Sequence, residues 1–289
     1  MLTLPGPIVS AAWLLEHATH PDLRIVDLRW SLGGPPGRDL YAVGHIPGAI
    51  FLDLDLDISA PPGSGPGRHP IPTPRQLERV LSVRGIGDDQ VVVAYDDAGG
   101  TVASRLWWLF EHFRHAGTAA ILDGGISAWT AGGGTLTAMP PAHPPATWRA
   151  GAPRTDDVVD AAIVDARRLD PGTLLLDVRA PERYRGELEP IDPRAGHIPG
   201  AVSAPWAGNL QPDGHLLSPE GLADRFRALG AADGRRVIAA CGSGVNATQT
   251  ILAMRLTGIT AQLYEGSWSD WSSDLTRPAA IGPDPGGVA

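Results

Sequence analysis

The only cysteine of the chain, Cys241, lies in a run of small residues, Cys-Gly-Ser-Gly-Val-Asn (241–246). Gly242 and Gly244 allow the backbone to turn tightly and to aim successive N–H groups inward. An apolar segment precedes the run and a helical pattern follows it, so these N–H groups join a helix N-terminus, where anions bind. Such a loop favours a thiolate and would equally stabilise a terminal persulfide. The pattern predicts a nucleophilic cysteine rather than a cysteine of the core.

Cysteine loops of this kind serve several enzyme classes, which the neighbouring residues separate. A cysteine phosphatase needs an arginine in a Cys-x5-Arg loop to stabilise the transferring phosphoryl group. Ala247 stands at that position, and no Arg or Lys occurs between Cys241 and Arg255, which disfavours a phosphatase. A cysteine protease or acyl transferase would need a histidine near the thiol. His45 and His197 are candidates by residue type, but no motif ties either of them to the loop.

The elements around this loop occur twice along the chain, which indicates a duplicated domain and not a short-period repeat. Four landmarks recur in the same order with similar spacing. They are LRIVDLRW with GHIPGAI (23–50) against LLLDVRAP with GHIPGAV (174–202), VVVAYD (91–96) against RVIAAC (236–241), and LDGGISAW (122–129) against YEGSWSDW (264–271).

The two copies differ at the position of the cysteine, because Asp96 stands where the second copy has Cys241. Asp cannot do thiol chemistry, so we predict a catalytically silent first domain that forms one wall of the site. A segment rich in Gly, Pro and Ala separates the copies and is typical of an extended linker. The predicted organisation is a first domain over 1–138, a linker over 139–154, a catalytic domain over 155–275 and an irregular tail over 276–289.

Short apolar runs alternate with helical patterns in each copy, which predicts an α/β fold. Continuous apolar runs are typical of parallel sheets covered on both faces. We therefore expect two tandem domains, each a mostly parallel sheet flanked by helices, with Cys241 at the carboxyl end of a strand, where such folds bind ligands. The predicted strands are 24–28, 91–95, 119–122, 173–178, 236–240 and 261–264, and the predicted helices include 74–83, 102–112 and 219–229.

The composition excludes several kinds of partner. Of the 289 residues, 23 are Lys or Arg and 32 are Asp or Glu, which gives a net charge of -9 and argues against nucleic acid or an anionic membrane. One cysteine permits no intramolecular disulfide, which indicates a reducing compartment. No signal-peptide pattern and no apolar run of about 18 residues occur, so we expect a soluble, cytoplasmic protein. Neither a metal-ligand pattern nor a cofactor fingerprint is evident, and we predict no metal and no cofactor.

The motifs together carry a family resemblance over nearly the whole chain. The chain resembles the tandem-domain rhodanese-type sulfurtransferases, the group that contains thiosulfate and 3-mercaptopyruvate sulfurtransferases. The motifs are Asp-Leu-Arg-Trp (27–30), Gly-His-Ile-Pro-Gly-Ala (44–49 and 196–201), Leu-Asp-Gly-Gly (122–125) and Cys-Gly-Ser-Gly-Val (241–245).

The resemblance implies two rhodanese-like domains and a two-step transfer. Cys241 takes sulfur from a small anionic donor and becomes a persulfide, which a thiol, cyanide or a thioredoxin-like protein then discharges. It implies no cofactor, and a monomer is the simplest assembly. A module that relays its persulfide only to a dedicated protein partner remains the alternative.

The loop sequence bears on the donor. Members that prefer mercaptopyruvate resemble Cys-Gly-Ser-Gly-Val, whereas those that prefer thiosulfate resemble Cys-Arg-Lys-Gly. The resemblance implies that Ser243 acts with His45 and Asp39 of the first domain. It also implies that Arg183 binds the substrate carboxylate, for which the forked guanidinium is suited.

The chain departs from the family pattern at two positions. Ile191 follows Glu-Pro where mercaptopyruvate enzymes carry a second arginine, and Arg185 or Arg194 are the candidates to replace it. Asn246 replaces the usual Thr or Ser. The donor is therefore left open between mercaptopyruvate and thiosulfate. The predicted substrate-binding residues are Arg183, Arg185, Gly242, Gly244, Val245 and Asn246.

Overall fold

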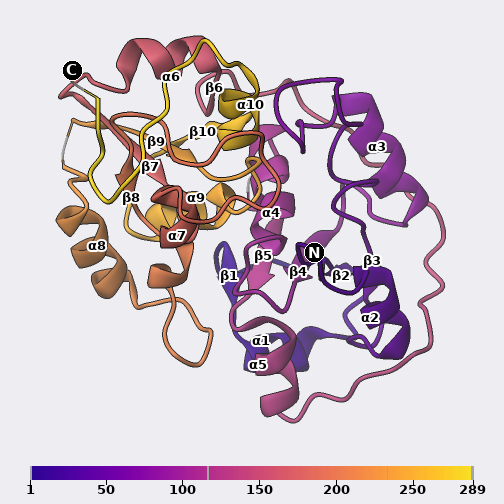
Figure 1. Cartoon of the computed structure of the whole chain (residues 1–289). Helices are drawn as coiled ribbons and strands as arrows, with labels where there is room; N and C mark the ends of the chain where they lie inside the picture. The colour runs from indigo at the N-terminus through magenta and orange to yellow at the C-terminus, as the bar shows by residue number, and fades with distance from the viewer. Residues whose placement is uncertain (1, 116, 233, 288–289) are drawn as a thin grey trace. The chain divides into compact units, whose positions relative to one another are not determined.

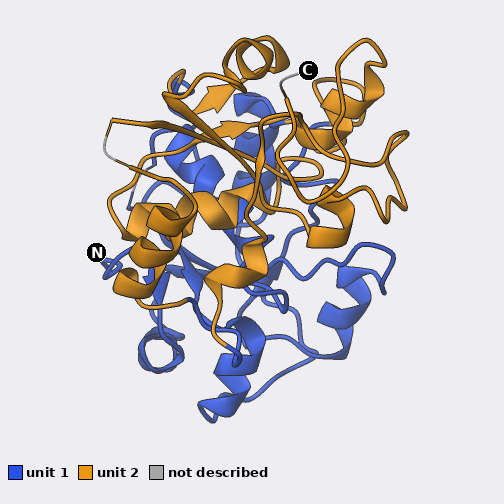
Figure 2. Ribbon diagram, turned by 60° about the vertical axis from the view of Figure 1, so that its left-hand side comes forward, with its two compact units in different colours: residues 1–60, 71–154, 212–216 blue, residues 61–70, 155–211, 217–289 orange. Residues whose placement is uncertain are grey.

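The computed structural model describes residues 2–115, 117–232 and 234–287, which form two compact units (Figure 2). The first unit comprises residues up to 60, 71–154 and 212–216, and the second comprises 61–70, 155–211 and the residues from 217 onward. The segment expected as a linker, 139–154, is thus grouped with the first unit. Segment 61–70, which the sequence placed in the first domain, is grouped with the second.

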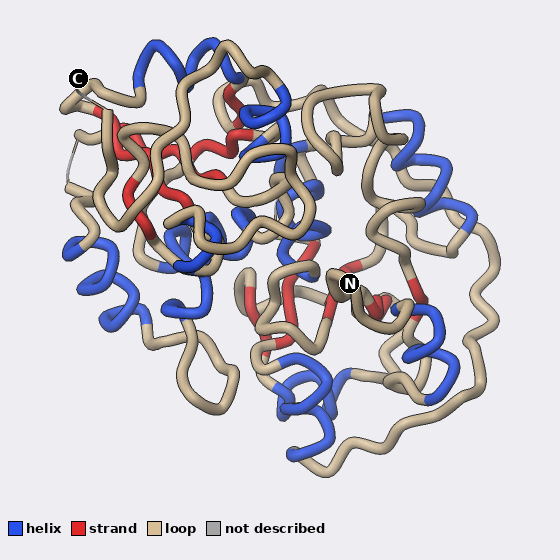
Figure 3. Tube along the Cα trace, in the orientation of Figure 1, coloured by secondary structure: helices blue, strands red, loops and turns tan. Residues whose placement is uncertain are grey.

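Each unit is built on one five-stranded parallel sheet, and the two sheets have the same strand order. The strands are labelled in Figure 1 and drawn in red in Figure 3. In the first unit the order is β1 (Ile8–Val9), β5 (Ala119–Leu122), β4 (Val91–Tyr95), β2 (Leu23–Asp27) and β3 (Ile50–Phe51). In the second unit it is β6 (Val158–Val159), β10 (Gln262–Tyr264), β9 (Arg236–Ala240), β7 (Thr173–Asp177) and β8 (Val202–Ser203).

The strand register confirms that Asp96 and Cys241 are equivalent. Asp27 of β2 lies opposite Tyr95 of β4, and Asp177 of β7 lies opposite Ala240 of β9. Asp96 and Cys241 are therefore the first residues beyond the same strand of the two sheets.

The helices of the first unit begin where local signals predict them. Thr73 caps α3 (Pro74–Val83) by accepting the Gln76 N–H, and Pro74 occupies the first helical position, where its missing N–H is not needed. The long loop before it, between β3 and α3, contains segment 61–70. The helices are α1 (Ala11–His17), α2 (Gly37–Val43), α3 (Pro74–Val83), α4 (Ala103–His112) and α5 (Gly125–Ala131).

The helices of the second unit follow the same plan. Ser218 caps α8 at its N-terminus, with Pro219 as the first helical residue. They are α6 (Ala161–Arg167), α7 (Pro181–Tyr184), the short 3-10 helix η1 (Trp206–Asn209), α8 (Pro219–Ala228), α9 (Ala247–Leu256) and α10 (Ser267–Ser273).

The predicted α/β fold with two parallel sheets is confirmed, and each of the six predicted strands occurs to within one residue at either end. The sequence did not reveal β1, β3, β6 and β8, because a strand of two residues is too short to show a pattern. Among the described residues, no helix is long and apolar enough to cross a membrane.

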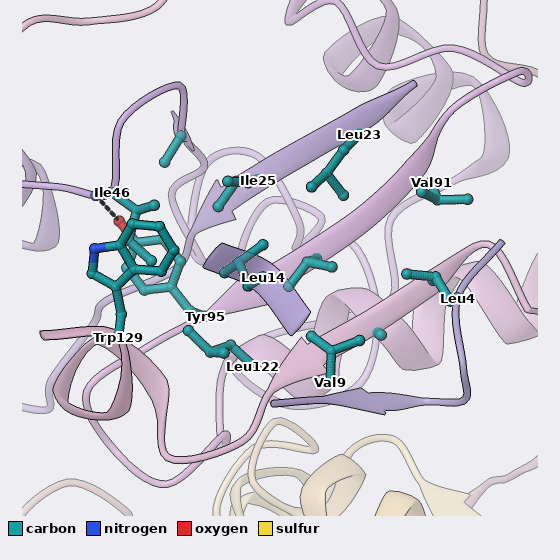
Figure 4. Packing of buried hydrophobic residues seen from close by; sticks show 13 residues of the cluster. Leu4, Val9, Leu14, Leu23, Ile25, Ile46, Val91, Tyr95, Leu122 and Trp129 are labelled. Atoms are coloured by element: carbon teal, nitrogen blue, oxygen red, sulfur yellow. Dashed lines mark hydrogen bonds between the residues drawn. The ribbon is translucent and has the colours of Figure 1, made fainter. Parts of the chain in front are cut away.

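Apolar side chains from the strands and helices of the first unit pack into one cluster (Figure 4). Leu23, Ile25 and Val91 contribute from the sheet, and Leu14 contributes from α1. Tyr95 lies in this cluster, and its hydroxyl accepts a hydrogen bond from the backbone N–H of Ile46 at 3.2 Å, so its polar atom is not left unpaired (Figure 4). Such a core holds the end of β4, and with it Asp96, in place.

Candidate active site

The Cys241 loop (residues 241–246) joins the carboxyl end of β9 to α9. Cys241 is buried, with 3% of its surface exposed. Two backbone hydrogen bonds tie the loop to α10: the Trp268 N–H donates to the Cys241 carbonyl at 3.0 Å, and the Ser269 N–H donates to the Gly242 carbonyl at 2.9 Å. The thiol is thus held at the edge of a parallel sheet where ligands usually bind.

The sulfur of Cys241 has polar neighbours on two sides. It accepts a hydrogen bond from the Gly244 N–H at 3.1 Å. Ser267 Oγ accepts the Cys241 N–H at 3.0 Å and lies 4.0 Å from the sulfur. Ser267 has a φ of 52°, a left-handed conformation that is uncommon for a residue with a side chain and that concentrates at functional sites. The Ser267 hydroxyl donates to the Tyr264 carbonyl at 2.9 Å, so the Gly244 N–H is the donor placed to stabilise negative charge on the sulfur, as a nucleophile requires.

The two glycines of the loop have different physical roles. Gly244 has a φ of 77°, and a Cβ there would collide with the Glu265 carbonyl oxygen, so only glycine fits. A Cβ at Gly242 would lie 3.1 Å from Arg68 Nη2 and 3.4 Å from Arg183 Nη1. Two guanidinium groups therefore lie against the backbone directly beside the cysteine.

Asp192, whose side chain is buried, connects these two arginines. One of its carboxylate oxygens forms an ion pair with Arg68 Nη1, and the other lies 3.1 Å from Arg183 Nη2. Arg183 Nη2 also lies 2.6 Å from Glu189 Oε1. Burial raises the pKa of the Asp192 carboxyl, although the charges of Arg68 and Arg183 act in the opposite direction. The carboxylates of Asp192 and Glu189 thus orient both cations.

Ser243 forms a buried hydrogen bond with His69, at 2.7 Å between Oγ and Nδ1. The structure thus pairs Ser243 with His69 and not with His45, the partner implied by the resemblance. His69 and Arg68 come from segment 61–70, which is anchored to α10 by a hydrogen bond from the Arg68 N–H to Ser269 Oγ at 3.1 Å. Sequence reasoning missed both residues, although an adjacent Arg-His pair in the Gly- and Pro-rich run GSGPGRHP was an available signal.

His45 instead supports a turn of the first unit. Its Nδ1 lies 2.8 Å from the Tyr41 carbonyl oxygen, its Nε2 lies 3.1 Å from that of Met139, and its ring stacks on Tyr41. His197 of the second copy repeats this arrangement, with Nδ1 2.8 Å from the Tyr184 carbonyl oxygen and the same stacking. A role that both copies share is structural. The implied partner of His45, Asp39, is an exposed residue of α2.

The remaining predicted residues have other environments. Arg185 is paired with the exposed Glu187, at 2.7 Å. Arg194, the other candidate for the second arginine, donates to backbone carbonyls that include those of Ser272 and Arg277.

Val245 is buried in the Cys241 loop. Asn246 is the residue before α9, where its side chain makes no capping hydrogen bond. The contact of the loop backbone with the thiol described above comes from Gly244.

In the equivalent loop of the first unit, the Asp96 loop (residues 96–102), the first side chain binds the backbone that follows it. The buried Asp96 carboxylate accepts four backbone N–H groups at 2.8–3.0 Å, from Ala98, Gly100, Val102 and Ala103. Within the described parts of the chain, no group of three or more His, Cys, Asp or Glu side chains is arranged to hold a metal ion.

Comparison with known proteins agrees with this architecture. The model of the rhodanese-like domain matches the chain twice, over residues 10–132 and 160–274. The chain is 44% identical to the "Probable 3-mercaptopyruvate sulfurtransferase" of Pseudomonas aeruginosa over 95% of this chain and 98% of that protein. It is 31% identical to the thiosulfate sulfurtransferase of Bos taurus, over 98% and 97% of the two chains.

Among solved structures, the chain matches the 3-mercaptopyruvate sulfurtransferase SseA of Escherichia coli. The TM-score is 0.80 and the identity 29%, over 91% of this chain and 99% of SseA. The chain belongs to the rhodanese family, with two rhodanese domains. It is an enzyme, and its class is sulfurtransferase.

Proposed function

We propose that the transferred sulfur is carried on Cys241 as a persulfide. The Cys241 thiolate attacks the sulfur to be transferred, which is the outer sulfur of thiosulfate or the thiol sulfur of 3-mercaptopyruvate. A sulfur–sulfur bond forms, and the bond that held this sulfur in the donor breaks. With thiosulfate the electron pair leaves on sulfite. With 3-mercaptopyruvate it leaves on carbon, which takes up the proton of the donor thiol and becomes the methyl group of pyruvate. The hydrogen bond from the Gly244 N–H to the sulfur carries this assignment, because the same donor would stabilise the persulfide anion.

We further propose 3-mercaptopyruvate as the preferred donor. Cleavage of its carbon–sulfur bond moves a proton, whereas the reaction of thiosulfate does not. Ser243 and His69 supply a buried hydroxyl–imidazole pair beside the nucleophile that can relay such a proton. Arg183, whose Nη1 faces Gly242, supplies a cation for the carboxylate. The loop itself carries no Arg or Lys beside the cysteine, where a dianion would favour one.

The test is a kinetic comparison of the two donors, measured as thiocyanate released to cyanide. Cys241→Ser should abolish turnover with both donors, because a hydroxyl cannot carry sulfane sulfur. Ser243→Ala should lower kcat/KM for 3-mercaptopyruvate by about 10- to 100-fold and change that for thiosulfate little. Ser273→Ala, an exposed serine of α10, is the matched control. Equal losses with both donors would refute the assigned proton relay, and turnover in Cys241→Ser would refute the persulfide.

We propose a thiol, cyanide or a thioredoxin-like protein as acceptor, and a monomer in the cytoplasm as the working form. A reducing compartment suits an enzyme whose single cysteine must stay unoxidised between turnovers. Turnover with small thiols supports this acceptor class. Stoichiometric transfer to one protein, with no turnover on small acceptors, would instead identify a dedicated relay.

A further inference from the structure

Two guanidinium groups face Gly242, and only that of Arg183 was expected from the sequence. A Cβ at Gly242 would lie 3.1 Å from Arg68 Nη2, closer than the 3.4 Å to Arg183 Nη1. Because Gly242 follows Cys241, any donor that reaches the thiol over this residue meets both groups. We propose that Arg68 is a specificity-determining residue that binds the anionic group of the sulfur donor together with Arg183. This inference rests on the proposed function and extends it to segment 61–70, which carries none of the four repeated landmarks.

The ion pairs of Arg68 and Arg183 leave the nitrogens that face Gly242 for this role. Asp192 pairs with Nη1 of Arg68 and with Nη2 of Arg183. The opposite nitrogens, Nη2 of Arg68 and Nη1 of Arg183, are the ones that face Gly242. Asp192 therefore holds each guanidinium by one edge and turns another edge toward the loop. A carboxylate placed there would be bound between two cations.

The other arginines near this segment are engaged differently. Arg185 donates from Nε and Nη2 to the two carboxylate oxygens of Glu187. Arg194 donates to backbone carbonyls of the chain that follows α10 and thereby holds that segment. Arg179 pairs with Asp177 and donates to the Gly196 carbonyl. Unlike these three arginines, Arg68 faces the cysteine loop beside Arg183.

The single cysteine allows this subsite to be tested without any turnover. Iodoacetate and iodoacetamide alkylate the same thiol, and they differ in that iodoacetate carries a carboxylate. Their rate ratio at Cys241 therefore reports the cations near the sulfur, and mass spectrometry of the single-cysteine chain measures it directly. We expect Arg68→Met to lower the iodoacetate-to-iodoacetamide ratio about 10-fold or more, because a hydrogen bond between charged groups is lost. Arg68→Lys, which keeps the charge, should retain most of the ratio.

Arg168→Met is the matched control. Arg168 is also a partly buried arginine paired with a carboxylate, Asp165, but it follows α6 at the amino end of β7, away from the carboxyl ends of the strands. Its substitution should leave the ratio unchanged. A ratio unchanged in Arg68→Met, or equal losses in both alkylation rates, would overturn the proposal.

Donor kinetics then separate this inference from the proposed function. Arg68→Met should raise KM for 3-mercaptopyruvate about 10-fold while kcat changes less, because the residue binds the donor and takes no part in proton transfer. A lower alkylation ratio in Arg68→Met would support the anion subsite even if the wild type released no thiocyanate, an outcome that would refute the sulfurtransferase assignment alone. A wild type active on 3-mercaptopyruvate, with the same KM in Arg68→Met, would overturn the role of Arg68 alone.

Discussion

The Asp96 loop and the Cys241 loop follow equivalent strands of two sheets with the same strand order. The first side chains of the two loops differ in how many backbone N–H groups they accept. Asp96 accepts four backbone N–H groups of its own loop and of the start of α4. The Cys241 sulfur accepts one, from Gly244. A carboxylate has two oxygens with which to satisfy such donors, whereas a thiol sulfur is a weak acceptor.

The number of accepted N–H groups distinguishes the Asp96 loop from the Cys241 loop. In the first unit the N–H groups that could bind an anion are used by a side chain of the loop, so they stabilise the fold. In the second unit the proposed nucleophile, Cys241, stands at this position, and side chains from three other segments lie against its loop: Arg68 and His69 from segment 61–70, Arg183 from α7, and Ser267 from α10. The loop at this position therefore binds its own side chain in the first unit, and in the second unit it carries the cysteine that we propose as the nucleophile.

Exchanging the two residues gives the largest expected effect. In the double variant Asp96→Cys/Cys241→Asp, thiocyanate release should fall at least about 1,000-fold, because a thiol at position 96 lacks the groups that surround Cys241. Assay of cyanide-labile sulfur per chain, with Asp96→Cys as the control that keeps Cys241, measures the loss. Activity comparable to the wild type in the double variant would mean that the loop alone is sufficient.

Removing the carboxylate of the first loop should cost stability rather than activity. Asp96→Ala leaves four backbone N–H groups without their acceptor, and we expect unfolding in urea to become about 3–4 kcal/mol easier. Asp97→Asn is the control: burial raises the pKa of Asp97, so a neutral amide should be tolerated there. Sulfur transfer per folded molecule should be unchanged in Asp96→Ala. A cost below about 1 kcal/mol would show that the carboxylate does not hold the loop.

His69 and His45 provide a matched pair of variants, because His69 bonds to the Cys241 loop and His45 supports a turn of the first unit. His69→Ala should lower kcat/KM with 3-mercaptopyruvate about 100-fold, since it removes the partner of Ser243. His45→Ala should instead lower the midpoint of thermal unfolding and leave the activity of the folded fraction intact, because its ring contacts belong to a turn. The reverse pattern would restore His45 as the partner implied by the resemblance.

The smallest expected effect concerns Asp192 beside the Cys241 loop, a carboxylate that is paired with two arginines. Burial raises the pKa of Asp192 in the folded state, so the folded protein binds this proton more tightly than the unfolded chain. The stability that the protonated Asp192 carboxyl contributes is fully present below the ordinary pKa of Asp. It is lost as pH rises through the raised pKa of the folded state. The free energy of unfolding of the wild type, relative to Asp192→Asn, should therefore decrease as pH rises from about 3 to about 7. Urea titrations at stepped pH test this, and an increase would mean that the two arginines outweigh burial.

Much of this molecule could be predicted from local patterns. Apolar runs of four to six residues identified the longer strands to within one residue, and Thr73-Pro74 and Ser218-Pro219 marked two helix starts. The equivalence of Asp96 and Cys241 also followed from the order of the landmarks. These features are encoded by neighbours in sequence, since strand burial and helix capping act over a few residues.

The partners of the cysteine loop could not be predicted in this way. His45 lies in a motif that stands out because it occurs twice, but the structure shows the same carbonyl-bound, stacked ring in both copies. His69 lies 174 positions from Ser243, in a loop without periodicity or repeat. No interaction between neighbours in sequence links His69 to Ser243.

The sequence by itself determined the longer strands of the sheets, the duplication and the place of Cys241 after β9, because backbone propensity and burial patterns are local. Only the tertiary structure decided which side chains lie against the Cys241 loop. It grouped segment 61–70 with the second unit, and so brought His69 to Ser243 and Arg68 to Gly242. The physical reason is that hydrogen bonds and ion pairs depend on distance in space, which packing sets, and not on distance along the chain.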